Sequence, residues 1–185
     1  MKSSFLVSFV LLAGCVAAPV SAPPPRTIAA RHPAAASALV VLAPASASLV
    51  SGRLTFVPMS GGVHLTGEIG GLAAGSTHGL HVHEKGDCSA ADASSAGPHF
   101  DTAARAHGRP GGALHHAGDL PNIVAGSDGV ARVDAHIDGL ALGGSAGADI
   151  LDRALVVHAQ ADDYASQPAG NSGARVACGV IRGGR

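Results

Sequence analysis

The sequence is poor in aromatic side chains and in charge. It has no Trp, one Tyr and four Phe, and charged residues make up 14% of its 185 positions. Lys and Arg together number 12 and Asp and Glu 13, so the net charge of −1 leaves no basic surplus for holding a phosphate backbone. These numbers argue against a nucleic-acid partner. The hydrophobic fraction of 46% is nevertheless enough to bury a core, which excludes wholesale disorder and favours one folded domain.

Cysteine is scarce, and no apolar run is long enough to cross a bilayer. Lys2 precedes the apolar stretch 5–12, whose length is typical of the central part of an export signal. This stretch ends in Leu12-Ala13-Gly14-Cys15, which resembles the lipobox of bacterial lipoproteins, where the Cys receives a diacylglycerol and becomes the first residue. We therefore predict a signal peptide over residues 1–14 and anchoring to a membrane through a lipid on Cys15.

The segment 15–37 is rich in Ala and Pro and lacks apolar periodicity. Such a composition predicts a tether between the lipidated Cys15 and the domain, with His32 as a solvated linker residue. Val16, rather than Asp, after the Cys favours sorting to the outer membrane if the host is Gram-negative. An ordinary signal cleaved after Ala22 is the alternative, and either route removes one of the three Cys from folding.

The remainder, residues 38–185, shows short alternating or β-branched segments between Gly, Pro, Ser and Asp, and no window of helical length keeps an apolar face. This pattern favours an all-β antiparallel sandwich or barrel. The predicted strands are 38–42, 52–58, 63–72, 78–84, 129–137 and 154–159. Two stretches, 85–123 and 161–173, predict long loops, and long loops in compact domains are usually functional or disordered.

Histidine is as abundant as Lys is rare, with eleven His against two Lys. Because side chains alternate along a strand, His81 and His83 share one face, while Leu80 and Val82 face the other way. Two imidazoles about 7 Å apart can close on one metal ion. The same pattern also fits a polar strand face exposed to solvent, so the pair alone leaves both interpretations open.

The first long loop contains His99, His107, His116 and Asp119, at separations of 8, 9 and 3 residues. Three imidazoles and a carboxylate form a ligand set typical of tetrahedral zinc, and a bound metal would order such a loop. A flexible His-rich segment that binds metals weakly is the competing interpretation.

Three further features involve residues near the C-terminal part of the chain. His158 ends an apolar strand, and Asp162 follows it. Cys88 and Cys178 are expected to form a disulfide in an exported protein. This bridge would close a loop of 90 residues and stabilise the folded state by about 4 to 5 kcal/mol in the chain-entropy model. Such a bridge would tie Arg175, three residues before Cys178, to the first loop.

Six motifs in this order resemble the copper,zinc superoxide dismutase family over residues 38–181: HGLHVHE, SAGPHF, His107, HAGDL, LVVHAQADD and GNSGARVACGVI. The resemblance implies a Greek-key antiparallel β-sandwich or flattened barrel, an architecture this family is known for, with two long metal-site loops. The position of Cys88, five residues after His83, resembles the bacterial periplasmic branch. The implied localisation is the cell envelope, in the periplasm and at the outer membrane.

The resemblance also implies site residues. Copper would be bound by His81, His83, His99 and His158, and zinc by His99, His107, His116 and Asp119. His99 would then bridge the two metals and take part in catalysis. Asp162 would hydrogen-bond the far nitrogens of His81 and His107. Arg175 would attract and orient the superoxide anion at the copper.

The implied activity is dismutation of superoxide to dioxygen and hydrogen peroxide at copper, with zinc as a structural cofactor. The alternative is a non-catalytic module for binding or delivering copper and zinc. The chain departs from the family in its second loop, where residues 164–174 carry no charge and Ala169 stands where a channel-lining Thr is expected. We hypothesise that long-range steering of substrate is weaker or relocated to Lys85, Arg105 or Arg109.

Outside these motifs, the patterns assign the remaining histidines of the domain, His64, His78, His115 and His136, to structure or surface. The sequence leaves monomer and homodimer both open.

Overall fold

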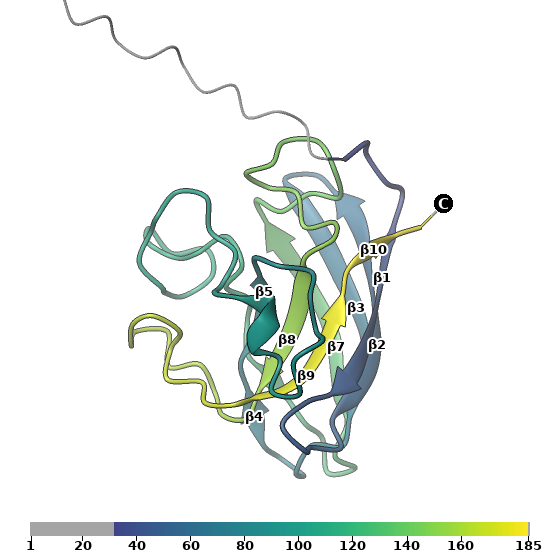
Figure 1. Cartoon of the computed structure of the whole chain (residues 1–185), viewed down its shortest axis with the longest axis vertical. Coiled ribbons are helices and arrows are strands. Elements are labelled where there is room, and N and C mark those ends of the chain that lie inside the picture. Colours follow the sequence, from purple (N-terminus) through teal and green to yellow (C-terminus); the bar gives the residue numbers. More distant parts are fainter. Residues whose placement is uncertain (1–31, 185) are drawn as a thin grey trace, which may run out of the picture.

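The computed structural model describes residues 32–184, and the regular structure of this part is β apart from one turn of 3-10 helix (Figure 1). The main sheet runs in the order β5 (Leu80–His83), β8 (Ala154–His158), β9 (Arg175–Val180), β1 (Ala38–Pro44), β2 (Ser51–Met59), β3 (Gly62–Gly70) and β7 (Ala131–Asp138), with β10 (Arg182–Gly183) beside β1. Two short strands, β4 (Thr77–His78) and β6 (Ile123–Val124), pair separately, and the helical turn is η1 (Ser94–Ala96). All of these strand pairs are antiparallel.

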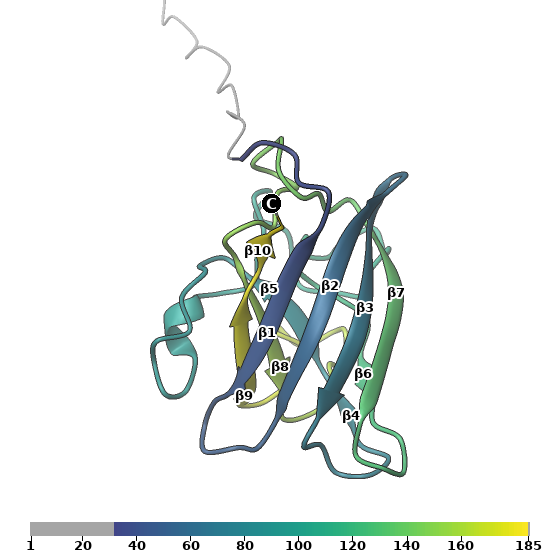
Figure 2. The same ribbon diagram turned by 90° about the vertical axis from the view of Figure 1, so that its right-hand side faces the viewer.

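The connectivity is that of a Greek-key barrel rather than a simple meander. β1, β2 and β3 follow one another as hairpins and stand side by side with β7 (Figure 2). The chain then crosses the barrel twice, from β3 to β5 at the opposite edge of the sheet and from β7 back to β8. The predicted all-β Greek-key fold is confirmed.

The interior follows from the alternation along the strands. In β7 the buried side chains are Ala131, Val133 and Ile137, while the charged residues between them face outward. β8 is buried along its whole length. Its outer face is covered as well, because Val156 packs in a second small apolar cluster with residues of the η1 loop.

The η1 loop is bound covalently to the sheet. Cys88, in the loop, and Cys178, in β9, form the predicted disulfide, with their Cα atoms 5.8 Å apart. This tie places the loop against the strand that carries Arg175, which positions the site described below.

Five of the six predicted strands correspond to β1, β2, β3, β7 and β8, each within two residues at its ends, whereas the short strands β6 and β10 were not predicted. The segment predicted as one strand over 78–84 is two, β4 and β5, which are interrupted at Gly79. β9 was not predicted, although it lies in the middle of the sheet. The interpretation of His32 as a solvated linker residue is wrong, because its ring is hydrogen-bonded to the buried Asp149.

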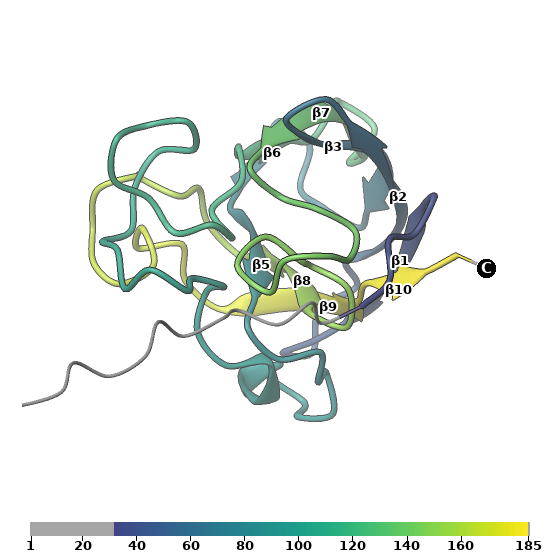
Figure 3. The same cartoon turned by 90° about the horizontal axis from the view of Figure 1, so that it is seen from above.

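The two predicted loops lie side by side on one flank of the barrel (Figures 1 and 3). They are joined by hydrogen bonds between Gln167 and the backbone of His107. The predicted signal peptide 1–14, the predicted lipidation site Cys15 and the predicted tether up to residue 31 lie outside the described residues. Between residues 32 and 184, no helix is long and apolar enough to cross a membrane.

Candidate metal centre

Two groups of potential metal ligands meet at the base of the loops. In the first group, β5 supplies His81 and His83, the end of β8 supplies His158, and the first loop supplies His99. The second group consists of His99, His107, His116 and Asp119. In each group one ligand atom from every member lies within 4.8 Å of the others. The seven residues predicted from the family motifs are therefore brought together as two adjacent quartets that share His99.

Backbone carbonyls fix which nitrogen two of the rings present. His83 Nδ1 donates to the carbonyl of Gly97 at 2.8 Å, and His158 Nδ1 donates to that of Gly173 at 3.2 Å. Each ring is thereby left with its Nε2 lone pair, and these two Nε2 atoms are 3.4 Å apart. The geometry suits two ligands of one ion.

Asp162 orients one ring from each quartet. Its Oδ2 accepts from His81 Nε2 at 2.8 Å, and its Oδ1 accepts from His107 Nε2 at 2.9 Å. The opposite nitrogens, Nδ1 of His81 and Nδ1 of His107, are buried and have no hydrogen-bond partner. A buried nitrogen without a hydrogen-bond partner is costly. No donor occupies the lone pair of either Nδ1 atom, so both atoms are available to a metal ion.

The second quartet converges on one carboxylate oxygen. Asp119 Oδ1 lies 2.8 Å from Nδ1 of His99, 3.0 Å from Nδ1 of His107 and 3.3 Å from Nδ1 of His116. In tetrahedral zinc with bonds of about 2.0–2.1 Å, neighbouring ligand atoms are about 3.3 Å apart, so a small opening of the quartet accommodates the ion. Asp119 Oδ2 is held separately by the backbone N–H groups of Gly108 and His116.

His99 connects the two groups. Its Nδ1 faces Asp119, whereas its Nε2 is buried without a partner, and its ring centroid is 3.9 Å from that of His81. One imidazole thus presents a nitrogen to each group, which is the arrangement needed to bridge two ions.

Burial lowers the pKa of three rings in the first group, those of His83, His99 and His158. It lowers the pKa of His99 to about 4, against the opposing effect of Asp119, and the pKa of His158 to about 3. Burial and the neighbouring His99 likewise hold the pKa of His83 well below its ordinary value. Although burial opposes it, hydrogen bonds from His99 and two backbone N–H groups keep the pKa of Asp119 far below the usual range. At neutral pH the rings of His83, His99 and His158 are therefore free bases and the Asp119 carboxylate is ionised, as metal ligation requires.

A fixed cation stands beside the first group. Arg175 donates from its two terminal nitrogens to the carbonyls of Ala93 and Gly97, each at 2.7 Å. Gly97 has φ 74°, a conformation favoured by glycine, and its carbonyl also accepts from His83. Burial lowers the pKa of Arg175, partly offset by Asp92, but the ordinary guanidinium value is so high that the side chain stays charged. The guanidinium and the His83 ring are thus positioned by the same carbonyl oxygen.

Three supporting residues were missed by the sequence reasoning. The Asn122 side chain donates to the backbone carbonyl of Asp162 at 2.8 Å and accepts from its N–H at 2.9 Å. Gln167 holds the backbone of His107 in the same two-point way, at 2.9 and 3.0 Å. Gly170 has φ 63°, and a Cβ there would overlap the Asp162 carboxylate and the His107 ring. Asn122 lies in the first loop and Gln167 in the uncharged second loop, and no pattern distinguishes either from ordinary loop residues. Gly170 opens the motif GNSGARVACGVI, but the motif does not reveal its contact with Asp162.

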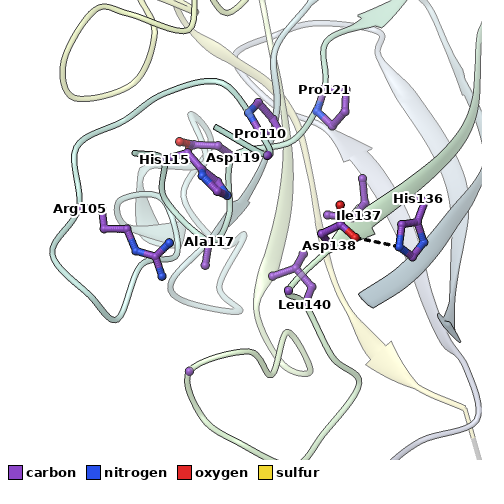
Figure 4. A pocket seen from close by; sticks show the side chains of 13 residues that line it. Arg105, Pro110, His115, Ala117, Asp119, Pro121, His136, Ile137, Asp138 and Leu140 are labelled. Carbon is purple, nitrogen blue, oxygen red and sulfur yellow. Dashed lines mark hydrogen bonds and ion pairs between the residues drawn. The ribbon is translucent and has the colours of Figure 1, made fainter. Parts of the chain in front are cut away.

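A hollow of about 330 Å³ lies beside the second quartet and away from the first (Figure 4). Arg105 and His115 line one side, and the hydrogen-bonded pair His136 and Asp138 lines the other. Asp119 is the one quartet member in its lining. The hollow therefore does not lead to the nitrogens of His83 and His158.

A family model described as copper/zinc superoxide dismutase (SODC) matches residues 50–181. The chain belongs to the copper/zinc superoxide dismutase family. Superoxide dismutase [Cu-Zn] of Caulobacter vibrioides is 43% identical over 137 residues, covering 71% of this chain and 78% of the relative. Superoxide dismutase [Cu-Zn] 2 of Mesembryanthemum crystallinum is 45% identical over 139 residues, with 71% and 86% covered.

Solved structures agree with the fold. The clock protein EA4 superposes with a TM-score of 0.72 at 39% identity, covering 81% of this chain and 96% of that one. A double mutant of a SOD-like protein from Bacillus subtilis gives a TM-score of 0.70 at 37% identity, with 78% and 97% covered. The family thus includes relatives named as superoxide dismutases and relatives named only as similar to them.

The donor sets fit the cofactors of the dismutase family. Copper accepts imidazole nitrogens, and the second quartet, with its carboxylate, matches the ligands and geometry of zinc. The remaining histidines of the domain lie outside both quartets. His78 donates from its Nδ1 to the carbonyl of His158 at 2.8 Å, and the His115 ring donates to the carbonyl of Gly112. His64 and His136 pair with carboxylates on the outer face of the sheet.

Proposed function

We propose that this protein dismutates superoxide in the cell envelope, with copper held by His81, His83, His99 and His158 and zinc by His99, His107, His116 and Asp119. The observation that carries the proposal is the shared ring of His99, with one nitrogen facing the carboxylate quartet and the other, unpaired and buried, facing the all-histidine quartet. Bound copper would supply a one-electron couple that accepts an electron from one superoxide and returns it to another, whereas zinc has no redox chemistry.

The residues around that couple have separate tasks. Arg175 offers a fixed positive charge for the anion, because its guanidinium is held by two carbonyls. Asp162 keeps the rings of His81 and His107 turned so that Nδ1 of each points inward. His99 Nε2 is the ring atom that can hold a proton and pass it to the product, since Nδ1 is engaged at Asp119.

Activity with matched variants tests the catalytic proposal. The Cu/Zn-loaded protein should consume superoxide with one copper and one zinc per chain. Arg175→Ala should keep both metals and lose at least about tenfold in kcat/KM. His158→Ala should lose copper and activity while retaining zinc. Activity indifferent to His158→Ala contradicts the copper assignment, and stoichiometric metal without superoxide consumption supports the metal-delivery alternative.

For localisation, we propose lipidation at Cys15 and an envelope position, periplasmic and attached to the outer membrane. The support is the lipobox-like Leu12-Ala13-Gly14-Cys15 and the disulfide, which persists in oxidising compartments. Cys15→Ser should release the protein from membranes in cell fractionation. Release of the unaltered protein after cleavage at Ala22, read by mass spectrometry, would contradict the lipid anchor.

A further inference from the structure

Residues 32–37, here called the N-terminal strap, lie on the domain at the end of the predicted tether. The carbonyl of His32 accepts from Gly144 at 2.8 Å, and the N–H of Ala35 donates to Leu142 at 2.9 Å. Ser37 accepts from Gly184 at 2.8 Å, and Ala35 packs against the main core. The strap is therefore paired to the connection between β7 and β8 and to the C-terminal end.

One side chain fastens the strap from its first residue. His32 Nδ1 is 2.6 Å from Asp149 Oδ2, and His32 Nε2 is 3.2 Å from Asp152 Oδ2. Asp149 is fully buried, with Oδ1 accepting from the N–H groups of Gly143 and Leu151 at 2.8 and 2.9 Å. The other carboxylate oxygen, Oδ2, faces His32. The ring of His32 therefore supplies the hydrogen-bond donor that this buried oxygen needs.

Both ring nitrogens face carboxylate oxygens, so their protonation state decides the bonding. An imidazolium donates from both nitrogens, whereas a neutral ring donates from one and directs a lone pair at the other carboxylate. The cations nearby do not change charge near neutral pH. Arg182 pairs with Asp152 Oδ1, and Arg153 donates to the backbone carbonyl of Asp149 at 2.7 Å. His32 is thus the side chain through which this cluster can gain or lose a proton, because its two ring nitrogens face two carboxylates and an imidazole, unlike a guanidinium, exists in both a neutral and a charged form.

We propose that His32 is a pH-sensitive clasp that holds the N-terminal strap on the domain when protonated and loosens it as pH rises. The direction of the pH effect follows from the hydrogen bonds. Protonation gives the ring a second donor and places a positive charge between two carboxylates, so the docked strap is more stable at low pH. Release frees six residues, which add up to about 20 Å of extended chain. The clasp itself does not depend on the proposed lipid anchor; its effect on the distance from a membrane does.

Trypsin reports on the strap at a natural site. Arg31 directly precedes His32, and Arg26 lies five residues earlier in the same predicted tether. Cleavage requires several residues on both sides of the bond to fit the protease, so a docked strap protects the Arg31 bond. The ratio of cleavage at Arg31 to cleavage at Arg26, followed by mass spectrometry on the full metal-loaded chain, cancels the effect of pH on trypsin.

The ratio should rise by at least about tenfold from pH 6 to pH 8.5, the change expected for loss of one charge-assisted hydrogen bond. His32→Gln should give the high ratio at both pH values, and the control His136→Gln, which alters an Asp-paired His on β7, should behave like the unaltered chain. A ratio independent of pH, or a pH effect that persists in His32→Gln, overturns the clasp.

Asp152→Asn provides a second variant in case His32→Gln does not fold. It removes one of the two charges that favour the imidazolium, so its ratio should change clearly less with pH than that of the unaltered chain. An undiminished change in Asp152→Asn would overturn the two-carboxylate geometry. None of these outcomes depends on superoxide consumption or on Cys15, so failure of the clasp and failure of the proposed function are distinguishable.

Discussion

At the scale of single residues, the centre depends on groups that are not ligands. Asp162 touches a ring in each quartet, and its backbone is clamped by Asn122. Gly170 leaves the space that the Asp162 carboxylate occupies. The proposed ligands were predicted from their motifs, because imidazoles and carboxylates are rare enough in this order to be recognised. Asn122, Gln167 and Gly170 were not, because their roles consist of backbone contacts that any loop could make.

Gly170 can be tested against a matched glycine. Gly170 and Gly75 both have positive φ, 63° and 72°, but a Cβ at Gly75 would meet nothing within 4 Å. Each Ala substitution should cost about 1–2 kcal/mol of unfolding free energy through backbone strain. Only Gly170→Ala should also displace Asp162 and lose zinc, measured as a release rate to a chelator. Equal zinc release from Gly170→Ala and Gly75→Ala would show that the contact with Asp162 is unimportant.

Protonation of the buried imidazoles sets a second expectation at this scale. The pKa values of His99 and His158 are lowered to about 4 and about 3, so between these values and the ordinary 6.5 the unfolded chain binds protons that the folded chain does not. The metal-free protein should therefore lose stability as pH falls from about 6.5 toward 4. Denaturant unfolding at pH 7, 6 and 5 measures this slope, and a stability that is constant or rises on acidification contradicts it.

At the scale of elements, β9 and the η1 loop act together. β9 carries Arg175 and Cys178, and the loop carries Cys88 and the two carbonyls that hold the guanidinium. β9 was not predicted, because its Gly has low strand propensity and its Gly and Cys were interpreted as part of a sequence motif. Its pairing with β8 and β1 nevertheless places it in the middle of the sheet.

Removal of the disulfide should therefore reduce activity through Arg175. Cys88→Ser combined with Cys178→Ser should lower the free energy of unfolding by about 2–5 kcal/mol. It should also lower kcat/KM several-fold at unchanged copper content. In an Arg175→Ala background the same pair should have little further effect on kcat/KM, since the two changes act on one contact. Additive losses in this double-mutant cycle would contradict the link.

At the scale of the whole molecule, the field around the site comes from few charges. Of the three cations proposed for steering, Arg105 pairs with Asp101 at 4.0 Å, and Arg109 stacks over the Tyr164 ring at 4.3 Å. Lys85 is exposed, and its stem lies along Gly97, whose carbonyl holds Arg175 and His83. Lys85 is thus the one of the three whose contacts lead to the proposed copper side.

Lys85→Gln should lower kcat/KM at low ionic strength and flatten its dependence on salt, because steering by exposed charge is screened over a Debye length of about 10 Å at 0.1 M. Arg109→Gln is the matched control and should change the salt dependence less. A steep salt dependence that survives neutralisation of both residues would assign the field to Arg175 and the metals alone.

The sequence by itself determined the chemistry of this protein. The histidines and the aspartate in their order, and the strand alternation that puts His81 and His83 on one face, are patterns with physical causes. Together with the pair of Cys in a chain predicted to be exported, they predicted the fold class and the disulfide. Only the tertiary structure decided what those residues do to one another: which nitrogen each ring presents, how Asp162 connects the quartets and why His32 is fastened rather than free. These depend on hydrogen bonds and burial between segments as many as 117 residues apart, as in the pair His32 and Asp149, and no local pattern encodes such distances.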